Sequence, residues 1–262
     1  MHAAIQGARV WFEDTGGDGA PVVFLHAGSG SSLLWKHQLP AFAAAGYRAI
    51  AYDRRGHGRT VNEAGAAPSA ADELRALLDY LAISRAHVVG TAAGGIAAFD
   101  FALSSPERTH SLVVANSHGG VQDEDYLALQ RRLRPSPFDA LPGELRELGP
   151  CYRAADPDGV REWKELEHQS IPGGVMPKVA TRNRITFAAL TSITAPLLLI
   201  TGDADLYIPP PVLTLFLDRL PRARSAVIPA CGHSAYWEQP DIFNKTVTNF
   251  LGSVSDTSQT PT

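Results

Sequence analysis

The fold is decided by residues 87–98, which read His87-Val88-Val89-Gly90-Thr91-Ala92-Ala93-Gly94-Gly95-Ile96-Ala97-Ala98. A β-branched run ends at Gly90, and an alanine-rich run of helical character starts beyond it. The chain must turn sharply between the two, and the small residues on both sides indicate close packing. This pattern matches the strand–turn–helix nucleophile elbow, G-x-S-x-G, whose central residue stands at the top of a sheet. Ala92 occupies that central position, so the turn is present and the serine is absent.

Strand and helix patterns alternate on both sides of this turn. Continuous apolar runs at 21–26 and 47–52 are typical of strands buried on both faces, and residues 69–81 have the spacing of an amphipathic helix. We also expect strands at 3–6 and 9–13 and a helix at 33–45. The alternation predicts a parallel sheet with helices on both faces.

The strand signal vanishes at residues 120–190, where short helix-like segments are expected at 123–134, 140–148, 159–169 and 177–189. An insertion of this size predicts a helical cap over the carboxyl edge of the sheet. Residues 1–119 and 191–251 then form the core. The Ser/Thr/Pro-rich residues 252–262 are expected to be a flexible tail.

Composition narrows the functional classes. The chain of 262 residues is 45% apolar and has a net charge of −4, with no block of lysine and arginine. A nucleic acid or an anionic membrane therefore finds no electrostatic footprint. No apolar run approaches the roughly 20 residues that span a bilayer, the N-terminus lacks an apolar signal region, and the two cysteines make no disulfide framework. We expect a cytoplasmic protein without a membrane partner.

Reactive side chains follow two later strands. Asp203 and Asp205 come directly after the strand expected at 196–201, and His233 follows the strand at 225–229. Alone, the acidic pair reads equally well as part of a catalytic site and as a helix-capping or solvent-facing loop pair, and a loop histidine is usually a surface residue. Together they gain weight, because a histidine base needs a carboxylate on its second nitrogen. They also follow the elbow in the order nucleophile, acid, histidine.

Five motifs in this order resemble those of the α/β-hydrolase superfamily over about residues 3–251. They are Leu25-His26-Ala27-Gly28, Asp53-Arg54-Arg55-Gly56-His57-Gly58, Gly90-Thr91-Ala92-Ala93-Gly94-Gly95, Gly202-Asp203-Ala204-Asp205 and Cys231-Gly232-His233. The run 232–244 is especially similar to the capped esterase, lactonase and carbon–carbon hydrolase branch. The resemblance implies an α/β-hydrolase fold, with a mostly parallel, doubly wound sheet and a helical cap insertion.

The resemblance also implies roles for individual residues. Asp205 is the acid, His233 the general base and acid, and Asp203 a structural neighbour. Backbone N–H groups of Gly28 and Ala93 are the expected oxyanion hole, which backbone donors supply whatever the side chain. Ala27 departs from the glycine usual after the histidine, and residues 53–58 are expected to brace the site.

The wall of the pocket is predicted less directly. The residues expected over Ala92 are Ser29, His118, Trp163, Leu206 and Ser234. His118 reads equally well as a group that binds a polar part of the substrate and as a solvated loop residue.

Alanine cannot attack a carbonyl, because it has no lone pair. Three interpretations of Ala92 remain: an engineered Ser→Ala change that traps a ligand, a natural ligand-binding homologue, or an enzyme that uses His233 and the oxyanion hole without a serine. We favour the first, because the acid, the base, the oxyanion loop and the elbow glycines are all retained.

The predicted parent activity is hydrolysis of a small carboxylic ester or lactone through an acyl-enzyme. A carbon–carbon hydrolase acting on a vinylogous diketone of the meta-cleavage type is the alternative enzyme, and a non-catalytic binder is the alternative of another class. The partner is a small molecule, and a homodimer is left open. No metal or organic cofactor is implied, since the chain has no His/Cys cluster at ligand spacing and no dinucleotide fingerprint.

Overall fold

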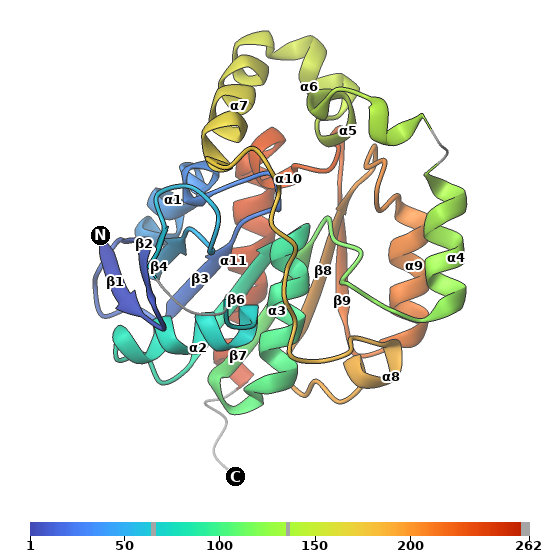
Figure 1. Ribbon diagram of the computed structural model, residues 1–262. Coiled ribbons are helices and arrows are strands. Elements are labelled where there is room, and N and C mark those ends of the chain that lie inside the picture. The colour runs from blue at the N-terminus through green and yellow to red at the C-terminus, as the bar shows by residue number, and fades with distance from the viewer. Residues whose placement is uncertain (64–66, 135–136, 258–262) are drawn as a thin grey trace.

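The computed structural model describes residues 1–63, 67–134 and 137–257 (Figure 1). Within them one sheet of nine strands has the order β1-β2-β4-β3-β6-β7-β8-β9, with β5 paired to β2. The strands are β1 (His2–Ile5), β2 (Ala8–Asp14), β3 (Pro21–Leu25), β4 (Arg48–Tyr52), β5 (Val61–Asn62), β6 (Ala86–Thr91), β7 (Thr109–Ala115), β8 (Leu197–Gly202) and β9 (Arg224–Ile228).

All pairings from β4 to β9 are parallel, whereas β2 runs antiparallel to β1, β4 and β5. Strand β6 lies in the middle, between β3 and β7, and all six of its residues are buried. Because the strands from β3 to β9 point the same way, their carboxyl ends meet at one edge. In open α/β sheets ligands bind at this edge.

Helices cover both faces of the sheet, as the alternation predicts (Figure 1). One apolar layer takes residues from α2 (Ala70–Tyr80), α3 (Ala93–Ser104), α8 (Phe187–Leu190) and α9 (Pro210–Arg219). The other takes residues from α1 (Gln38–Ala44), α10 (Ala235–Glu238) and α11 (Pro240–Thr257). In α2, Ser69 caps the first turn by accepting from the Asp72 N–H at 3.1 Å. Burial of an apolar side chain such as Leu74 contributes about 1.5–3 kcal/mol.

Two of the expected helices are wrong. Residues 33–45 divide into a 3₁₀ turn, Ser32–Trp35, and the shorter α1. Residues 177–186 are not helical. Their backbone is held instead by buried Asp100 on α3, whose carboxylate accepts from the N–H groups of Arg182 at 3.0 Å and Asn183 at 2.9 Å. Donors bound to a side chain in this way have no need of a helical turn.

The cap is smaller than the span 120–190 predicts. Helices α5 (Gly143–Glu147), α6 (Pro150–Ala155) and α7 (Pro157–Ser170) lie over the sheet edge, whereas α4 (Glu124–Leu133) lies beside α9 and α8 lies at the opposite end (Figure 1). Phe187 and Leu190 of α8 belong to the core layer under the sheet. The expected tail is also partly helical, since α11 continues to Thr257, and residues 258–262 lie outside the described residues. No helix in the described ranges is long and apolar enough to cross a membrane.

Candidate active site

The elbow is formed by the end of β6 and the start of α3, with Ala92 between them at φ 48° and ψ −114°. A non-glycine residue in this region stores roughly 1–3 kcal/mol of strain. The surroundings hold it: the Ala92 N–H donates to Ala115 O, and its carbonyl accepts from Gly95 N–H, both at 3.0 Å. A Cβ on Gly94 would lie 2.0 Å from Leu25 O, so this glycine is required by close approach of two backbones. The turn thus keeps the strained form of a nucleophile elbow without the serine.

Asp205 and His233 form a hydrogen-bonded dyad at the ends of β8 and β9. Nδ1 of His233 lies 2.9 Å from each carboxylate oxygen of Asp205. The Asn116 amide also donates to Asp205 at 2.9 Å, and the backbone N–H of Tyr207 donates at 2.7 Å. An ionised acceptor on one side of the ring fixes the Nδ1–H tautomer, which leaves Nε2 as the proton acceptor.

The electrostatics of the dyad agree with this geometry. Burial opposes charge on His233, but the carboxylates of Asp205 and Glu147 outweigh it and raise the pKa of His233 above its ordinary value. Burial likewise opposes charge on Asp205, but His233 and the Asn116 amide lower its pKa below the ordinary value. Asp205 therefore stays ionised and stabilises a protonated His233.

Gly28 and Ala93 lie next to each other at the elbow. A Cβ on Gly28 would come 3.4 Å from the Ala93 Cβ. Ala93 is the first residue of α3, so its N–H has no acceptor within the helix. The loop before Gly28 is held by Arg54, whose Nη2 donates to His26 O at 2.9 Å, and His57 Nε2 lies 2.9 Å from Gly28 O. Both residues also line the cavity above Ala92.

A cavity of about 230 Å³ opens above Ala92. Its lining residues are Ala27, Gly28, Ser29, Ala92, Ala93, His118, Arg134, Arg146, Glu147, Glu167, Met176, Tyr207 and His233. The structure thus brings together the elbow, the histidine and both expected oxyanion residues at one cavity. Among the residues it describes, no group of three or more His, Cys, Asp or Glu side chains is placed to hold a metal ion.

The predicted pocket residues divide into two groups. Ser29 and His118 line the cavity, whereas the other three do not. Trp163 is buried in the apolar layer that contains α11, where its indole is part of the hydrophobic core and not of the cavity wall. Leu206 points outward and is 48% exposed. Ser234 is buried beneath the histidine loop, where its N–H donates to Glu147 O at 3.1 Å.

Sequence reasoning missed the charged wall of the cavity. Tyr207 contacts both the histidine and this wall: its ring centroid lies 4.3 Å from that of His233, and its hydroxyl accepts from Arg146 Nη1 at 3.3 Å. Arg134 stands over the same ring at 5.0 Å. Glu147 holds the histidine loop through its carbonyl, which accepts the His233 N–H at 2.8 Å. In the sequence these residues appear only as charged side chains in or beside short, irregular helices. Such a pattern does not show which of them point into a cavity.

Three further titratable groups of this wall are shifted. Burial, and then the Arg134 charge, lower the pKa of His118 to about 4. Burial and the neighbouring Glu147 raise the pKa of Glu167 to about 7. Burial also raises the pKa of Glu147 above its ordinary value. His118 is therefore neutral at pH 7, and Glu167 titrates near neutral pH.

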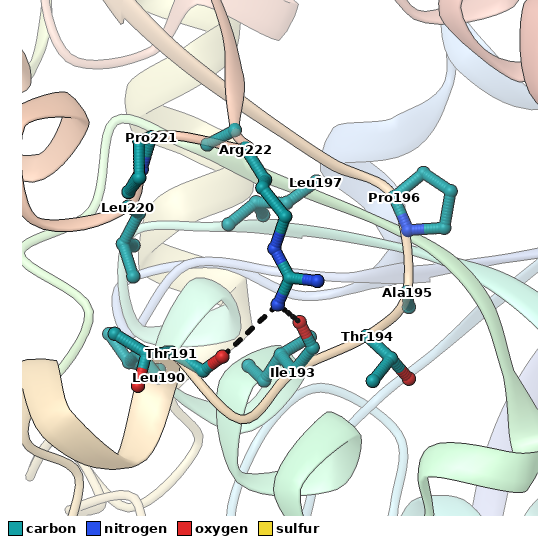
Figure 2. Close-up of a pocket in the computed structure, with 11 residues that line it drawn as sticks. Leu190, Thr191, Ile193, Thr194, Ala195, Pro196, Leu197, Leu220, Pro221 and Arg222 are labelled. Carbon is teal, nitrogen blue, oxygen red and sulfur yellow. Dashed lines mark hydrogen bonds between the residues drawn. The ribbon is translucent and has the colours of Figure 1, made fainter.

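A second cavity, of about 240 Å³, lies at the opposite end of β8 (Figure 2). It is mostly apolar, and Arg222 crosses it with Nη2 donating to Thr191 O at 3.2 Å. It has no histidine or carboxylate among its lining residues. It therefore offers none of the acid–base groups present above Ala92.

Glu238 fastens the histidine loop to the cap. Its buried carboxylate accepts from the N–H groups of Gly149 at 2.7 Å, Gly232 at 2.9 Å and Ser234 at 3.2 Å. We expect Glu238→Ala to lower the free energy of unfolding by about 3 kcal/mol or more, because three buried donors lose their acceptor. Urea denaturation checks this, with exposed Glu165→Ala as the matched control, expected within about 0.5 kcal/mol of the parent. Equal losses in both variants would contradict the fastening role.

Comparison with known proteins gives the family. The model of the alpha/beta hydrolase family matches residues 22–246. The chain is an α/β-hydrolase. The predicted fold, with its mostly parallel sheet, is thereby confirmed for this α/β-hydrolase.

Relatives of this α/β-hydrolase carry several activities in their names. The putative non-heme bromoperoxidase BpoC of Mycobacterium tuberculosis is 30% identical, covering 92% of this chain and 97% of its own. Its crystal structure, aligned at 28% identity over 97% of this chain and 98% of its own, has a TM-score of 0.74. A 2-hydroxy-6-oxononadienedioate/2-hydroxy-6-oxononatrienedioate hydrolase of Paraburkholderia phymatum is 30% identical, covering 93% and 91%. The enol-lactonase of Burkholderia xenovorans LB400 shares the fold, with a TM-score of 0.79, 22% identity, and coverage of 96% and 100%.

Proposed function

We propose that this chain has the framework of a serine hydrolase that cleaves a small carboxylic ester or lactone through an acyl-enzyme. The observation that carries the proposal is the Asp205–His233 dyad, joined at 2.9 Å, at a cavity whose floor is the elbow residue Ala92. The proposed substrate is a small molecule of the cytoplasm.

The proposed mechanism divides hydrolysis into two steps in a parent that carries serine at position 92. His233 Nε2 accepts the serine proton while the oxygen attacks the carbonyl carbon, and Asp205 stabilises the imidazolium. The N–H groups of Gly28 and Ala93 stabilise the oxyanion, and His233 then returns the proton to the leaving alcohol. Water, activated by the same histidine, hydrolyses the acyl-enzyme and regenerates the serine.

We infer that Ala92 replaces that serine and disables acyl transfer while binding is retained. The support is that the strained elbow, the ionised Asp205 and the hydrogen-bonded His233 all persist beside a residue that cannot react. A deliberate Ser→Ala change made to trap a ligand fits this pattern best. A natural homologue that binds a ligand without cleaving it is the competing function, and it differs in gaining no turnover when serine is introduced.

Carbon–carbon bond hydrolysis of a vinylogous diketone is a second candidate. The relative from Paraburkholderia phymatum, which is named for such a substrate class, is 30% identical over most of both chains. The same catalytic groups serve both reactions, so the cavity wall and not the dyad must discriminate.

The test is a substrate panel for the Ala92→Ser variant. It comprises 4-nitrophenyl esters of increasing chain length, simple lactones and a ring-cleavage dienedioate. Turnover of esters or lactones with burst kinetics supports the proposal, and turnover of the dienedioate alone supports the second candidate. A folded variant that turns over none of them leaves the binding homologue.

The pH dependence of the Ala92→Ser variant should report His233. The base must be neutral, so kcat/KM is expected to rise with pH through a pKa above the ordinary 6.5. The charged or titratable neighbours include Asp205, Glu147 and Arg134, together with His118, Tyr207 and Glu167 of the same cavity. Because Glu167 has a pKa of about 7, Glu167→Gln is the control and should leave the midpoint in place. If the midpoint disappears in Glu167→Gln, the titrating group is Glu167 and not His233, and the prediction is wrong.

A further inference from the structure

We propose that Arg134 is an anion-binding residue, and that it selects substrates carrying a carboxylate on the acyl side of the bond to be cleaved. The inference rests on the proposed function for its catalytic half and on the cavity alone for its binding half. The relevant groups are Arg134 itself, the side chains that orient it, and the neighbouring histidines whose pKa values it shifts.

Arg134 brings an unneutralised cation to the cavity. It lies at the end of α4 and lines the space above Ala92 together with His118 and His233. Its contacts are neutral: the Gln130 side-chain oxygen, which accepts from Nη2, and the face of the Tyr207 ring. No ion pair within 4.0 Å joins it to a carboxylate of the described residues. Its Nε is buried with no partner in the described part of the chain.

The guanidinium is held in position before any ligand arrives. Gln130 is 8% exposed, and its Nε2 donates to the Tyr126 hydroxyl at 2.9 Å, which turns its oxygen toward Arg134. Tyr126 is itself packed in the core beside Phe216. A guanidinium fixed in this way can bind a carboxylate through two parallel hydrogen bonds at little entropic cost.

The neighbours show that the charge acts on the cavity. Arg134 contributes to the low pKa of His118 and opposes protonation of His233. A substrate carboxylate would supply the countercharge that is missing from the contacts of Arg134. We therefore expect the guanidinium to attract an anion that enters the cavity.

Arg146, the other guanidinium of the wall, also has a buried Nε without a partner in the described residues, but its acidic neighbours make it less suited to this role. Its charge acts on Glu147 and Glu167, and its Nη1 donates to the Tyr207 hydroxyl. A ligand carboxylate there would meet two acidic side chains. We therefore place the anion at Arg134 and the acyl chain between it and the oxyanion residues.

The size of the cavity favours short substrates. Its volume of about 230 Å³ is smaller than the roughly 300–1,000 Å³ of pockets for drug-sized ligands. Half-esters of short dicarboxylic acids carry a carboxylate and an ester carbonyl in one small molecule, so they offer one group to Arg134 and one to the elbow. We take the glutarate half-ester as the probe.

The first arm measures selectivity in catalysis with the Ala92→Ser variant. Its substrates are 4-nitrophenyl hydrogen glutarate and its neutral isostere, 4-nitrophenyl 5-methylhexanoate. We expect kcat/KM to be at least about 10-fold higher for the glutarate, the scale of one hydrogen bond to a charged group. Arg134→Gln should abolish the preference, Arg134→Lys should keep part of it, and Arg131→Gln, an exposed arginine on the same helix, should leave it unchanged.

The second arm measures binding without any nucleophile. The chain with Ala92 is titrated calorimetrically with monomethyl glutarate and with methyl 5-methylhexanoate, and tighter binding of the glutarate must depend on Arg134. Circular dichroism shows whether each variant is folded.

The two arms separate failure of the inference from failure of the proposed function. Ester turnover without an Arg134-dependent preference overturns the inference and leaves the proposed function standing. Arg134-dependent binding without turnover by the Ala92→Ser variant overturns the hydrolase and leaves the anion site standing. No preference in either arm overturns the anion site.

Discussion

Replacing Ala92 with serine is expected to raise kcat toward activated esters by about 10⁶-fold over the chain as it stands, the scale lost when a serine protease loses its nucleophile. The reason is that the expected base and its acid are in place: His233 is oriented by Asp205, and residue 92 lines the same cavity as His233. A serine needs the same φ of 48° that Ala92 already adopts, so the backbone has no rearrangement to make.

The measurement is the release of 4-nitrophenol, together with mass spectrometry of a covalent adduct formed with a fluorophosphonate. The matched control is Ala92→Gly, which relieves the strain of the elbow but adds no oxygen. It should remain inactive and unlabelled while unfolding at an equal or higher urea concentration. A labelled Ala92→Gly protein would place the reactive group elsewhere, and a folded, unlabelled Ala92→Ser protein would contradict the prediction.

In that active background, Asp205→Asn is expected to lower kcat by about 10⁴-fold, as loss of the carboxylate does in the serine proteases. Asp205 is 2% exposed and accepts from His233, Asn116 and Tyr207. An amide in its place can present its NH₂ group to Nδ1, which favours the wrong tautomer and removes the charge that stabilises the imidazolium.

The control for this prediction lies two residues away. Asp203 is exposed and accepts the Cys231 N–H at 3.2 Å, but it does not touch His233. Asp203→Asn should therefore keep kcat within about a factor of ten. Steady-state kinetics of both double variants decide the matter, and equal losses would show that the loop as a whole, and not the Asp205 carboxylate, is what matters.

The core and the dyad could be predicted from the sequence because both depend on the backbone: close backbone contacts require glycine, and strand ends fix where the next residues lie. Gly90 and Gly94 have backbone within 2.3 Å of where a side chain would begin, and such contacts exclude other residues. Asp205 and His233 follow buried strands, and parallel strands carry whatever follows them to the same edge.

The wall of the cavity could not be predicted in the same way. Arg134 lies at the end of α4 and Glu147 at the end of α5, two short helices whose position depends on tertiary packing and not on a strand register. Tyr207 was missed beside the predicted Leu206, because a loop has no regular period that fixes which side chain faces the cavity. The segment 177–186 was missed because its hydrogen-bond partner, Asp100, is far away in sequence.

Asp100 has a consequence for how this enzyme family could be re-engineered. The segment 177–186, which leads from the cap back to the core, is hydrogen-bonded to helix α3 through the Asp100 carboxylate, which is fully buried. Replacing residues 120–190 with the cap of a relative would remove these hydrogen bonds and leave the Asp100 carboxylate buried without its donors. A graft that ends before residue 177 would keep them, so the interchangeable module is the set of α5, α6 and α7 and not the whole insertion.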